Sequence, residues 1–377
     1  MSDPSRPRIR FQVQPTVSHY REPLIRRLQA SRRLNLDLLG RFVNAESSEA
    51  DRIKSASAEV LKTIGPVHLR TWGKLWWEKG QVAAVWRGGY HAFVLEGRIY
   101  TASTWVAAAA GRLRGRRVYL WGHGWKRPED GIKRQFRLAF YSLVDGLLVY
   151  GDRAKDLGVS YGVPREKIKV VYNSLYSAQQ VEDSAAEVPP QAHDDVPTII
   201  YSSRLTTRHR LDTLAEALQD WDETAGPCPR VIIVGDGVER PRLERVFAEA
   251  GVPAQFLGAV YDVETLRELY AQADCAVSIG GAGLNVIQAL SFGVPVVAEA
   301  DNPDSSPEIE AVTEGETGRF YPRGDAAALR AVLQRVLGDR EELERMASRG
   351  REVILARYTA DRHAAAIEAA LLELLER

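Results

Sequence analysis

The sequence predicts an α/β fold of two doubly wound domains, each built on a parallel sheet. The first observation is the segment from Gln272 to Glu310, in which the short apolar run Cys275 to Ile279 has the composition of a strand buried on both faces. Glycines follow at once, apolar residues recur at helical spacing from Leu284, and a new strand, VPVVA, begins after Gly293. The second observation is the length of 377 residues, which suits two domains. The third is a polar segment rich in Ser, Ala, Pro and acidic residues, which we interpret as a linker over 176–197.

The first domain, residues 1–175, alternates apolar runs with helical periods. We expect its strands at 8–13, 36–43, 90–95, 117–120, 145–151 and 168–174. We expect its helices from about residue 24 and over about 46–63, 103–113 and 132–144.

The second domain, residues 198–357, repeats this alternation, and a final helix occupies 358–377. We expect its strands at 198–205, 230–237, 254–258, 275–279, 294–298 and 318–321. We expect its helices near 210–220, 243–250, 264–271 and 284–292, followed by two more before the final one.

Composition is that of a soluble globular protein, with 45% hydrophobic and 27% charged residues. The two cysteines, Cys228 and Cys275, cannot form a disulfide framework and lack metal-ligand spacing, which favours a reducing compartment. No apolar run has the length of a signal peptide core or a membrane span, so we expect a cytoplasmic protein.

The net charge of zero conceals an asymmetry between the two halves. Residues 1–180 hold 31 Lys and Arg against 15 Asp and Glu, whereas residues 181–377 hold 19 against 35, giving +16 and −16. Two interpretations stay open. Either the N-terminal half meets an anionic partner, such as the inner face of a membrane on which the protein would sit peripherally, or the two domains attract each other.

Tryptophans concentrate in the basic half, where seven of the eight lie between Trp72 and Trp125. In the segment 67–97 they alternate with Lys and Arg, a composition typical of a lipid interface or of a platform on which sugars stack. The alternative is a packed aromatic cluster. Under the binding interpretation, Trp76 and Trp77 contact the acceptor of a transfer reaction.

Two turns of the first domain carry polar side chains where the strands end. The first strand is followed by His19, Tyr20 and Arg21 rather than by a glycine fingerprint, which argues against an ordinary dehydrogenase. These residues either contact an acceptor or begin a capped helix. His123 lies between two glycines after a later strand, where side chains of an open sheet reach the ligand crevice.

Features suited to a diphosphate gather at strand ends of the second domain. Arg204 follows one strand, Gly235 and Gly237 follow another, and the helix beginning at Gly283 follows a third. Guanidinium groups and free helix amides both favour dispersed negative charge. Together they predict a nucleoside diphosphate ligand.

In the same order along the chain, the segments SSRLTTRHRLDTLAEAL, VIIVGDGVERPRLE, FLGAVYDVETLRELYAQADCAVS, GGAGLNVIQALSFGVPVVAE and SPEIEAVTEGETGRFYPRGD resemble motifs of the retaining glycosyltransferases of the GT-B fold, family 4. YREPLIRRL, WGHGWKRPEDG, LLVYG and IKVVYNS extend the resemblance to the N-terminal half. It implies two Rossmann-like domains facing across a cleft, with the C-terminal helix crossing back to the first.

The resemblance also implies site residues. Arg204 would neutralise the donor diphosphate, and His123 would touch the transferred sugar. The predicted donor site further comprises Gly235 and the segment 256–259, with Leu257 and Gly258, near the base, Gly283, Leu284 and Asn285 at the distal phosphate, and Gly237, His209, Gln288 and Glu308.

Three departures from the family pattern stand out. The two glutamates usual in the family fall on Gly280 and Gln288, and the usual lysine falls on His209, so cationic duty passes to Arg208, Arg210 or a protonated His209. Glu308 is the candidate for replacing a lost carboxylate. An amide at Gln288 still hydrogen-bonds ribose hydroxyls.

The implied reaction moves a sugar from a nucleoside diphosphate to an acceptor with retention at the anomeric carbon. The positive diphosphate site stabilises the leaving group, and a phosphate oxygen takes the acceptor proton, so neither a metal nor another cofactor is implied. The predicted acceptor is lipid-linked or a polysaccharide, and nucleic acid is not a predicted partner. The alternatives are a small natural-product acceptor, a non-catalytic GT-B subunit, and a nucleotide-sugar epimerase or hydrolase.

Overall fold

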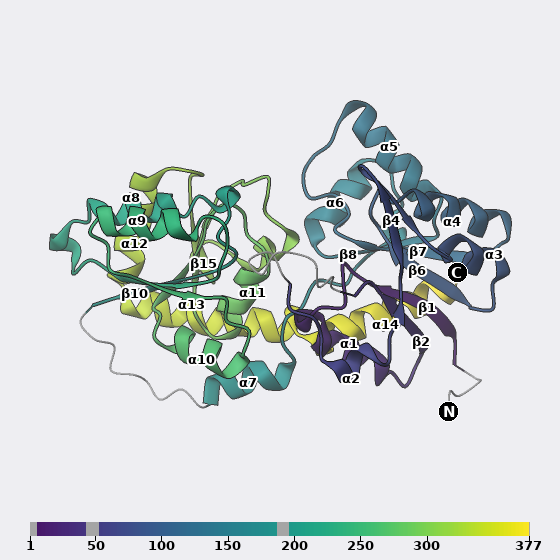
Figure 1. Cartoon of the computed structure of the whole chain (residues 1–377), viewed down its shortest axis with the longest axis horizontal. Helices are drawn as coiled ribbons and strands as arrows, with labels where there is room; N and C mark the ends of the chain where they lie inside the picture. The colour runs from purple at the N-terminus through teal and green to yellow at the C-terminus, as the bar shows by residue number, and fades with distance from the viewer. Residues whose placement is uncertain (1–5, 43–52, 187–195, 377) are drawn as a thin grey trace. The chain divides into compact units, whose positions relative to one another are not determined.

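The computed structural model describes residues 6–42, 53–186 and 196–376, which form two compact units (Figure 1). The N-terminal unit comprises 6–42, 53–175 and 360–376 of these residues, and the C-terminal unit comprises 176–186 and 196–359. Parts of the predicted helix over 46–63 and of the predicted linker lie outside the described residues.

The N-terminal unit is built on a parallel sheet of seven strands in the order β3-β2-β1-β6-β7-β8-β9. Its strands are β1 (Arg8–Val13), β2 (Asn35–Gly40), β3 (Gly65–Pro66), β6 (Ala92–Glu96), β7 (Arg117–Gly122), β8 (Gly146–Val149) and β9 (Ile168–Val170). Central strands such as β6 and β8 are buried along their whole length, because helices cover both faces of a doubly wound sheet.

Helices and a hairpin surround this sheet. The helices are α1 (Glu22–Gln29), α2 (Ala58–Leu61), α3 (Gln81–Arg87), α4 (Ala102–Leu113), α5 (Gly131–Ser142), α6 (Asp152–Ser160) and α14 (Ala360–Glu376). The tryptophan-rich segment 67–97 forms the antiparallel hairpin β4 (Leu69–Trp72) and β5 (Leu75–Glu78), then α3 and β6.

The last helix of the chain, α14, belongs to the N-terminal unit, as the sequence predicted. Its buried side chains Ile367 and Leu371 share a core with Leu24 and Leu28 of α1, and Figure 1 shows the two helices side by side. Burying such side chains contributes about 1.5–3 kcal/mol each, which holds α14 against the sheet.

The C-terminal unit is built on a parallel sheet of six strands in the order β12-β11-β10-β13-β14-β15. Its strands are β10 (Thr198–Ser202), β11 (Arg230–Val234), β12 (Ala254–Gly258), β13 (Cys275–Ser278), β14 (Val296–Glu299) and β15 (Gly318–Tyr321). Its helices are α7 (Ala178–Ala186), α8 (Asp212–Gln219), α9 (Arg240–Glu249), α10 (Val263–Ala271), α11 (Leu284–Ser291), α12 (Ala326–Leu337) and α13 (Arg340–Val353).

The prediction of two doubly wound parallel sheets is therefore confirmed. Three aspartates mark helix starts of the C-terminal unit, since Asp262, Asp325 and Asp339 each accept a hydrogen bond from a first-turn amide of α10, α12 and α13. One segment differs from expectation, because the first part of the predicted linker is helix α7, with Val181 buried. No helix among the described residues is long and apolar enough to cross a membrane.

Candidate active site

In the C-terminal unit, two loops meet at the carboxyl edge of the sheet through glycine backbone. The amide of Leu205 donates to the carbonyl of Asp236 over 2.9 Å, and a Cβ at Gly235 or Gly237 would lie 1.9 and 2.1 Å from the carbonyl oxygens of Ser203 and Leu205. Only glycine permits this approach. The loop that carries Arg204 is thus fixed, and its guanidinium remains exposed at the edge.

Gly258 joins the same edge from β12. Its carbonyl accepts a 2.8 Å hydrogen bond from the amide of Gly235, and Leu257 beside it is half-buried. The predicted base-lining residues Gly235, Leu257 and Gly258, and the predicted donor residue Gly237, therefore lie at one edge, where backbone contacts join their loops.

The glycine loop before α11 is packed so closely that no side chain fits at its first position. A Cβ at Gly280, where φ is +74°, would lie 2.3 Å from Cα of His209 and 2.5 Å from the carbonyl oxygen of Arg208. This contact explains why glycine stands where the family pattern has glutamate. The family's carboxylate has no room in this backbone.

A carboxylate that the sequence analysis missed lies directly behind this loop. Glu299, at the end of β14 and 3% exposed, accepts a 2.9 Å hydrogen bond from the amide of Gly280 and a second from Asn302 Nδ2. One feature of the sequence could have indicated Glu299. It ends β14, which lies beside β13, the strand that leads into the glycine loop.

His209 is buried and neutral, which removes one of the options for the missing lysine. Its Nδ1 lies 2.8 Å from Thr206 Oγ1, and its Nε2 accepts from the guanidinium of Arg208 over 2.9 Å. Burial, together with Arg208 and Arg204, lowers the pKa of His209 to about 4. At pH 7 the cations next to His209 are therefore Arg204 and Arg208. The expectation that a protonated His209 could replace the family's lysine is wrong.

At the start of α11 the side chain of Asn285 organises the backbone. Its Oδ1 accepts from the amide of Gly283 and its Nδ2 donates to Ser278 Oγ, both over 2.9 Å. The first amides of an α-helix have no acceptor within the helix, so those of Leu284 and Asn285 are directed at the sheet edge. This is the geometry of an anion site.

Two further predicted donor residues lie nearby in the C-terminal unit. Gln288, one turn further along α11, accepts a long hydrogen bond of 3.4 Å from Ser202 Oγ. Glu308, on the 3-10 turn Pro307–Ala311, is 2% exposed, and its carboxylate is therefore inside the protein rather than on its surface.

In the N-terminal unit, His123 follows β7 at the carboxyl edge of the seven-stranded sheet. Its ring packs edge-on against Tyr150 with centroids 5.1 Å apart. Crowding by protein atoms and the cations Lys126, Arg21 and Arg98 lower the pKa of His123 to about 3. The imidazole is therefore neutral at pH 7, and His123 is exposed to solvent.

Arg21 has a different position from the one expected of an acceptor ligand. It is 3% exposed, and its guanidinium donates to the carbonyl of Gln14, Asn173 Oδ1 and Tyr150 OH over 2.9, 2.5 and 3.1 Å. The prediction of direct acceptor contact by Arg21 is thus corrected: the side chain supports the residues around His123 from inside.

The neighbouring predicted residues are partly buried. His19 Nδ1 lies 3.0 Å from the carbonyl oxygen of Lys54, and the ring of Tyr20 meets His19 edge-on at 5.6 Å. They form the single 3-10 turn that leads into α1, so both interpretations of this turn stay open.

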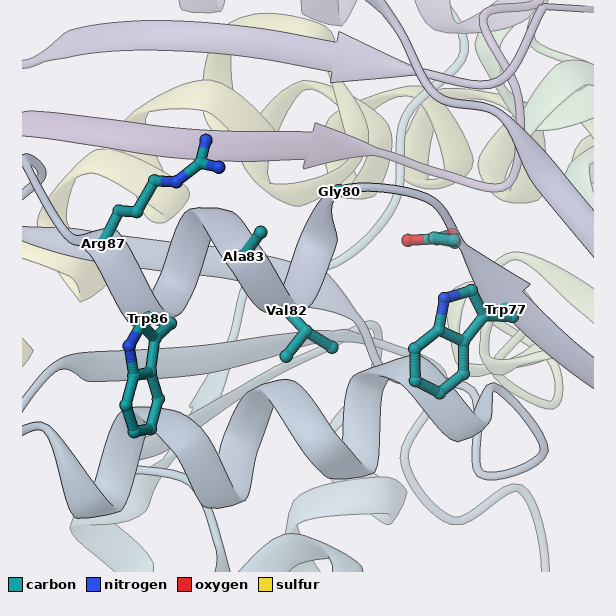
Figure 2. Close-up of a pocket in the computed structure, with 7 residues that line it drawn as sticks. Trp77, Gly80, Val82, Ala83, Trp86 and Arg87 are labelled. Carbon is teal, nitrogen blue, oxygen red and sulfur yellow. The ribbon is translucent and has the colours of Figure 1, made fainter.

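The two predicted tryptophans occupy separate surroundings. The ring of Trp76 contacts two guanidinium groups, since the guanidinium carbons of Arg41 and Arg98 lie 5.0 and 4.5 Å from its centroid. Trp77 instead lines a surface pocket of about 440 Å³, in which Figure 2 shows its indole and that of Trp86 on either side of Val82. The segment thus combines a packed aromatic group with an open apolar hollow.

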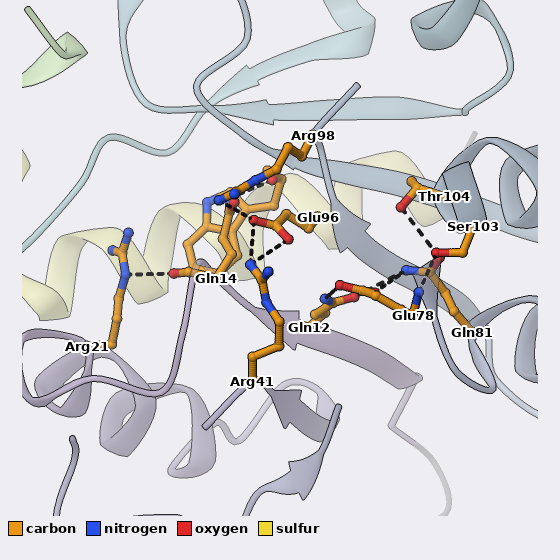
Figure 3. A network of polar contacts seen from close by, with 11 residues as sticks. Gln12, Gln14, Arg21, Arg41, Glu78, Gln81, Glu96, Arg98, Ser103 and Thr104 are labelled. Carbon is orange, nitrogen blue, oxygen red and sulfur yellow. Dashed lines mark hydrogen bonds and ion pairs between the residues drawn. The ribbon is translucent and has the colours of Figure 1, made fainter. Parts of the chain in front are cut away.

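Beside Trp76 lies a buried polar network that the sequence analysis did not find (Figure 3). Arg41 donates to both carboxylate oxygens of Glu96, over 3.0 and 2.8 Å, and Arg98 pairs with the same carboxylate over 2.8 Å. In the adjoining part, Gln12 and Gln81 each donate to Glu78 over 2.6 Å. Burial, with repulsion from Glu96, raises the pKa of Glu78 to about 7.

The comparisons with known proteins agree with this geometry. The solved structure of Anabaena HepE in complex with UDP and glucose matches at 19% identity and a TM-score of 0.65, covering 97% of this chain and 100% of that chain. Two doubly wound sheets of this order are the GT-B fold. Residues 184–353 match the family model described as Glycosyl transferases group 1.

The GT-B fold is confirmed, and residues 184–353 are similar to the glycosyl transferases group 1 family, the resemblance that the sequence predicted.

Three relatives match over shorter stretches. They are a phosphatidyl-myo-inositol mannosyltransferase of Mycobacterium leprae (31% identity over 38% of this chain), a GDP-mannose-dependent alpha-mannosyltransferase of Mycobacterium tuberculosis (33% over 35%) and an alpha-D-kanosaminyltransferase of Streptomyces kanamyceticus (22% over 56%). The matches span 37%, 32% and 56% of the relatives' own lengths. They support the family and leave the particular activity to be inferred.

Proposed function

We propose that this chain transfers a sugar, with retention, from a nucleoside diphosphate to an acceptor linked to a lipid or a polysaccharide at a membrane surface. The main observation in support of sugar transfer is the set of groups at the carboxyl edge of the C-terminal sheet. There the exposed Arg204 and the first amides of α11, fixed by Asn285, offer positive charge and hydrogen-bond donors to a diphosphate. These groups stabilise a leaving diphosphate, and one of its oxygens then accepts the acceptor proton.

The loss of the family's glutamate at Gly280 does not argue for an inactive protein. Glu299 from the neighbouring strand holds the amide of Gly280, so a carboxylate stabilises the loop from behind. The loop conformation, rather than a side chain in the site, is what this chain maintains.

The acceptor class rests on the surface of the N-terminal unit. Nine of the eleven large hydrophobic side chains found exposed among the described residues belong to this unit. Trp72 and Leu75 flank the tip of the β4–β5 hairpin, and Ile132 and Phe136 extend from α5, where Lys133 and Arg134 lie between them. Exposed apolar side chains among cations favour the boundary of an anionic membrane.

The relatives support both a lipid-linked acceptor and its main alternative. One relative is a phosphatidyl-myo-inositol mannosyltransferase, and another is an alpha-D-kanosaminyltransferase, so a small natural-product acceptor stays the second candidate. The pocket between Trp77 and Trp86 is the feature that a small acceptor would use.

A thermal-shift panel with UDP, GDP, dTDP and ADP and their sugar conjugates tests the donor site, because a ligand that binds the native state raises the melting temperature. We expect one base to stand out. If no nucleotide shifts the protein, the non-catalytic interpretation replaces ours. Release of free sugar from the matching conjugate without any acceptor would favour the hydrolase.

Sedimentation with vesicles tests the acceptor side. We expect binding to vesicles of phosphatidylcholine mixed with phosphatidylglycerol, weaker binding to pure phosphatidylcholine, and loss of binding in Ile132→Ser/Phe136→Ser. Val238→Ser, which removes an exposed side chain of the C-terminal unit, is the matched control. No binding by the parent protein would favour the soluble acceptor, and equal binding by all variants would show that Ile132 and Phe136 are not the membrane contact.

A further inference from the structure

The carboxyl edge of the seven-stranded sheet holds more guanidinium groups than carboxylates. Arg41 follows β2, Arg98 follows β6, and His123 follows β7, so these groups come from strands that lie close together in the sheet. Arg41 and Arg98 share the single carboxylate of Glu96, which is 1% exposed. Glu78, which interacts with the same two arginines, is only partly ionised at pH 7 because its pKa is raised to about 7, so a surplus positive charge remains at this edge.

Arg21 adds to the surplus from inside the same unit. All three of its hydrogen-bond acceptors are uncharged, namely a backbone carbonyl, an amide oxygen and a tyrosine hydroxyl, and no carboxylate pairs with it within the described residues. A buried cation without a counterion is costly, since buried charges in proteins are normally paired. Its charge, like that of Arg98, acts on the ring of His123.

Aromatic contacts order the guanidinium groups of Arg41 and Arg98. Both guanidinium groups contact the ring of Trp76, and Tyr100 meets Trp76 edge-on with centroids 5.2 Å apart. The amide of Trp76 also donates to the carbonyl of Tyr100 over 3.1 Å, which ties the hairpin to the loop that carries Arg98. Stacking on an aromatic face orders an arginine while its outer N–H groups stay available.

Arg98 is the member that solvent reaches. Its side chain is 25% exposed, against 11% for Arg41, and its ion pair with Glu96 uses one guanidinium nitrogen, Nη2. Figure 3 shows Arg41 and Arg98 reaching the carboxylate of Glu96 from different sides. A second oxyanion can therefore meet the free side of the Arg98 guanidinium without breaking the pair with Glu96.

We propose that this edge, formed by Arg98 and Arg41 around Trp76 and lying beside His123, binds a phosphate group of the acceptor. Phosphate suits it because a planar guanidinium binds two phosphate oxygens at once, and because a dianion matches the surplus of Arg21 and Arg98 better than a singly charged carboxylate does. The inference deepens the proposed function, on which it rests, by assigning the acceptor a phosphate close to the reacting hydroxyl.

Binding of inorganic phosphate at matched ionic strength tests the site in an Arg204→Ala background, which removes the competing anion site of the C-terminal unit. We expect Arg98→Gln to weaken phosphate binding about ten-fold or more, because a charge-assisted bidentate contact is lost. Arg33→Gln, an exposed arginine before β2 and hence at the opposite edge of the sheet, is the matched control and should change binding less than about two-fold.

Equal phosphate affinity in the parent and in Arg98→Gln would overturn the proposal, as would equal weakening by Arg33→Gln, which would indicate a diffuse basic surface. Arg98→Lys serves if the glutamine variant does not fold. It keeps a positive charge beside Glu96 but loses the planar fork, so we expect an intermediate loss of about three-fold or more. Unchanged affinity in the folded lysine variant would also contradict the site as described.

The source of the phosphate is tested separately. Binding of phosphatidylglycerol vesicles that depends on Arg98, with weak competition by glycerol 3-phosphate, supports a lipid headgroup. Binding of glycerol 3-phosphate that depends on Arg98, without vesicle binding, supports a soluble phosphorylated acceptor. Neither measurement uses the nucleotide, so a failed nucleotide panel would refute the proposed transfer without affecting the phosphate result.

Discussion

The two units expose the carboxyl edges of similar sheets but build them from different groups. In the C-terminal unit the edge is formed mainly by backbone, because glycines such as Gly235 and Gly280 let loops approach one another more closely than any Cβ allows. In the N-terminal unit the edge is formed by side-chain contacts among Arg41, Glu96 and Trp76.

This difference follows from what each edge binds in the proposed reaction. A diphosphate is the same in every nucleotide sugar, so amides and one exposed arginine suffice for it. An acceptor differs from enzyme to enzyme, and individual side chains can change without rebuilding a loop. Substitutions at the glycines of the C-terminal edge should therefore lower the stability of the protein. Substitutions of side chains at the N-terminal edge should instead change ligand affinity or the pH dependence of stability.

The largest expected effect is that of Gly280→Ala. Its Cβ would overlap the backbone of His209 and Arg208, and φ is +74°, so we expect the free energy of unfolding to fall by about 3 kcal/mol or more. Gly251→Ala is the control, since φ is +67° there but nothing lies within 4 Å, and it should cost about 1 kcal/mol. Equal losses in urea unfolding would show that the close approach at Gly280 is not what requires glycine.

Arg204→Ala should weaken binding of the nucleotide identified by the thermal-shift panel by about ten- to a hundred-fold, while stability changes by less than about 0.5 kcal/mol. The stability remains because Arg204 is exposed. Calorimetric titration measures the affinity, and Arg245→Ala, an exposed arginine of α9, is the control. Unchanged affinity in Arg204→Ala would remove this residue from the donor site.

Glu78 in the N-terminal unit should make stability depend on pH. The unfolded chain releases this proton near the ordinary value of 4.5, whereas the folded protein holds it until about pH 7, so the native state binds more protons in between. The free energy of unfolding should therefore decrease as pH rises through this window and level off above it. From pH 5.5 to 8 the decrease from this group is about 2 kcal/mol.

The comparison variant Glu78→Gln should lack that decrease, and Glu249→Gln, at an exposed position of α9, should keep it. Urea unfolding at several pH values measures both. Parallel pH dependence in the parent and in Glu78→Gln would show that Glu78 does not hold its proton in the folded protein.

The smallest expected effect is on the pH dependence of donor binding. Because the pKa of His209 is lowered to about 4, its ring stays neutral from pH 5.5 to 8, and the affinity for a nucleotide sugar should change less than about two-fold over that range. If the affinity falls steeply as pH rises past about 6.5, His209 binds the donor in its protonated form, contrary to this prediction.

The sequence predicted both sheets and the glycine-rich turns because apolar periodicity and glycine are local signals. Cys275 to Ile279 and the helix from Leu284 were placed to within one or two residues. Arg204, Gly235, Gly237 and Gly283 follow from the same logic, since parallel strands end together, whereas the other predicted donor residues came from the family resemblance.

What the sequence did not predict depends on contacts between distant segments. Glu299 reaches Gly280 across 19 residues, and Arg41 reaches Glu96 across 55, so no local pattern marks either pair. Arg21 was misplaced for the same reason: a charged residue in a turn is usually exposed, and only the folded unit shows it buried against Tyr150.

The location of α14 has a consequence for synthesis on the ribosome. Ile367 and Leu371 complete the hydrophobic core that α1 begins, although more than 300 residues separate them along the chain. The N-terminal unit therefore cannot finish folding first, as the leading domain of a nascent chain usually does. It must wait with one apolar face uncovered until the whole C-terminal unit has been translated, and chaperone binding to the nascent chain should be greatest during that interval.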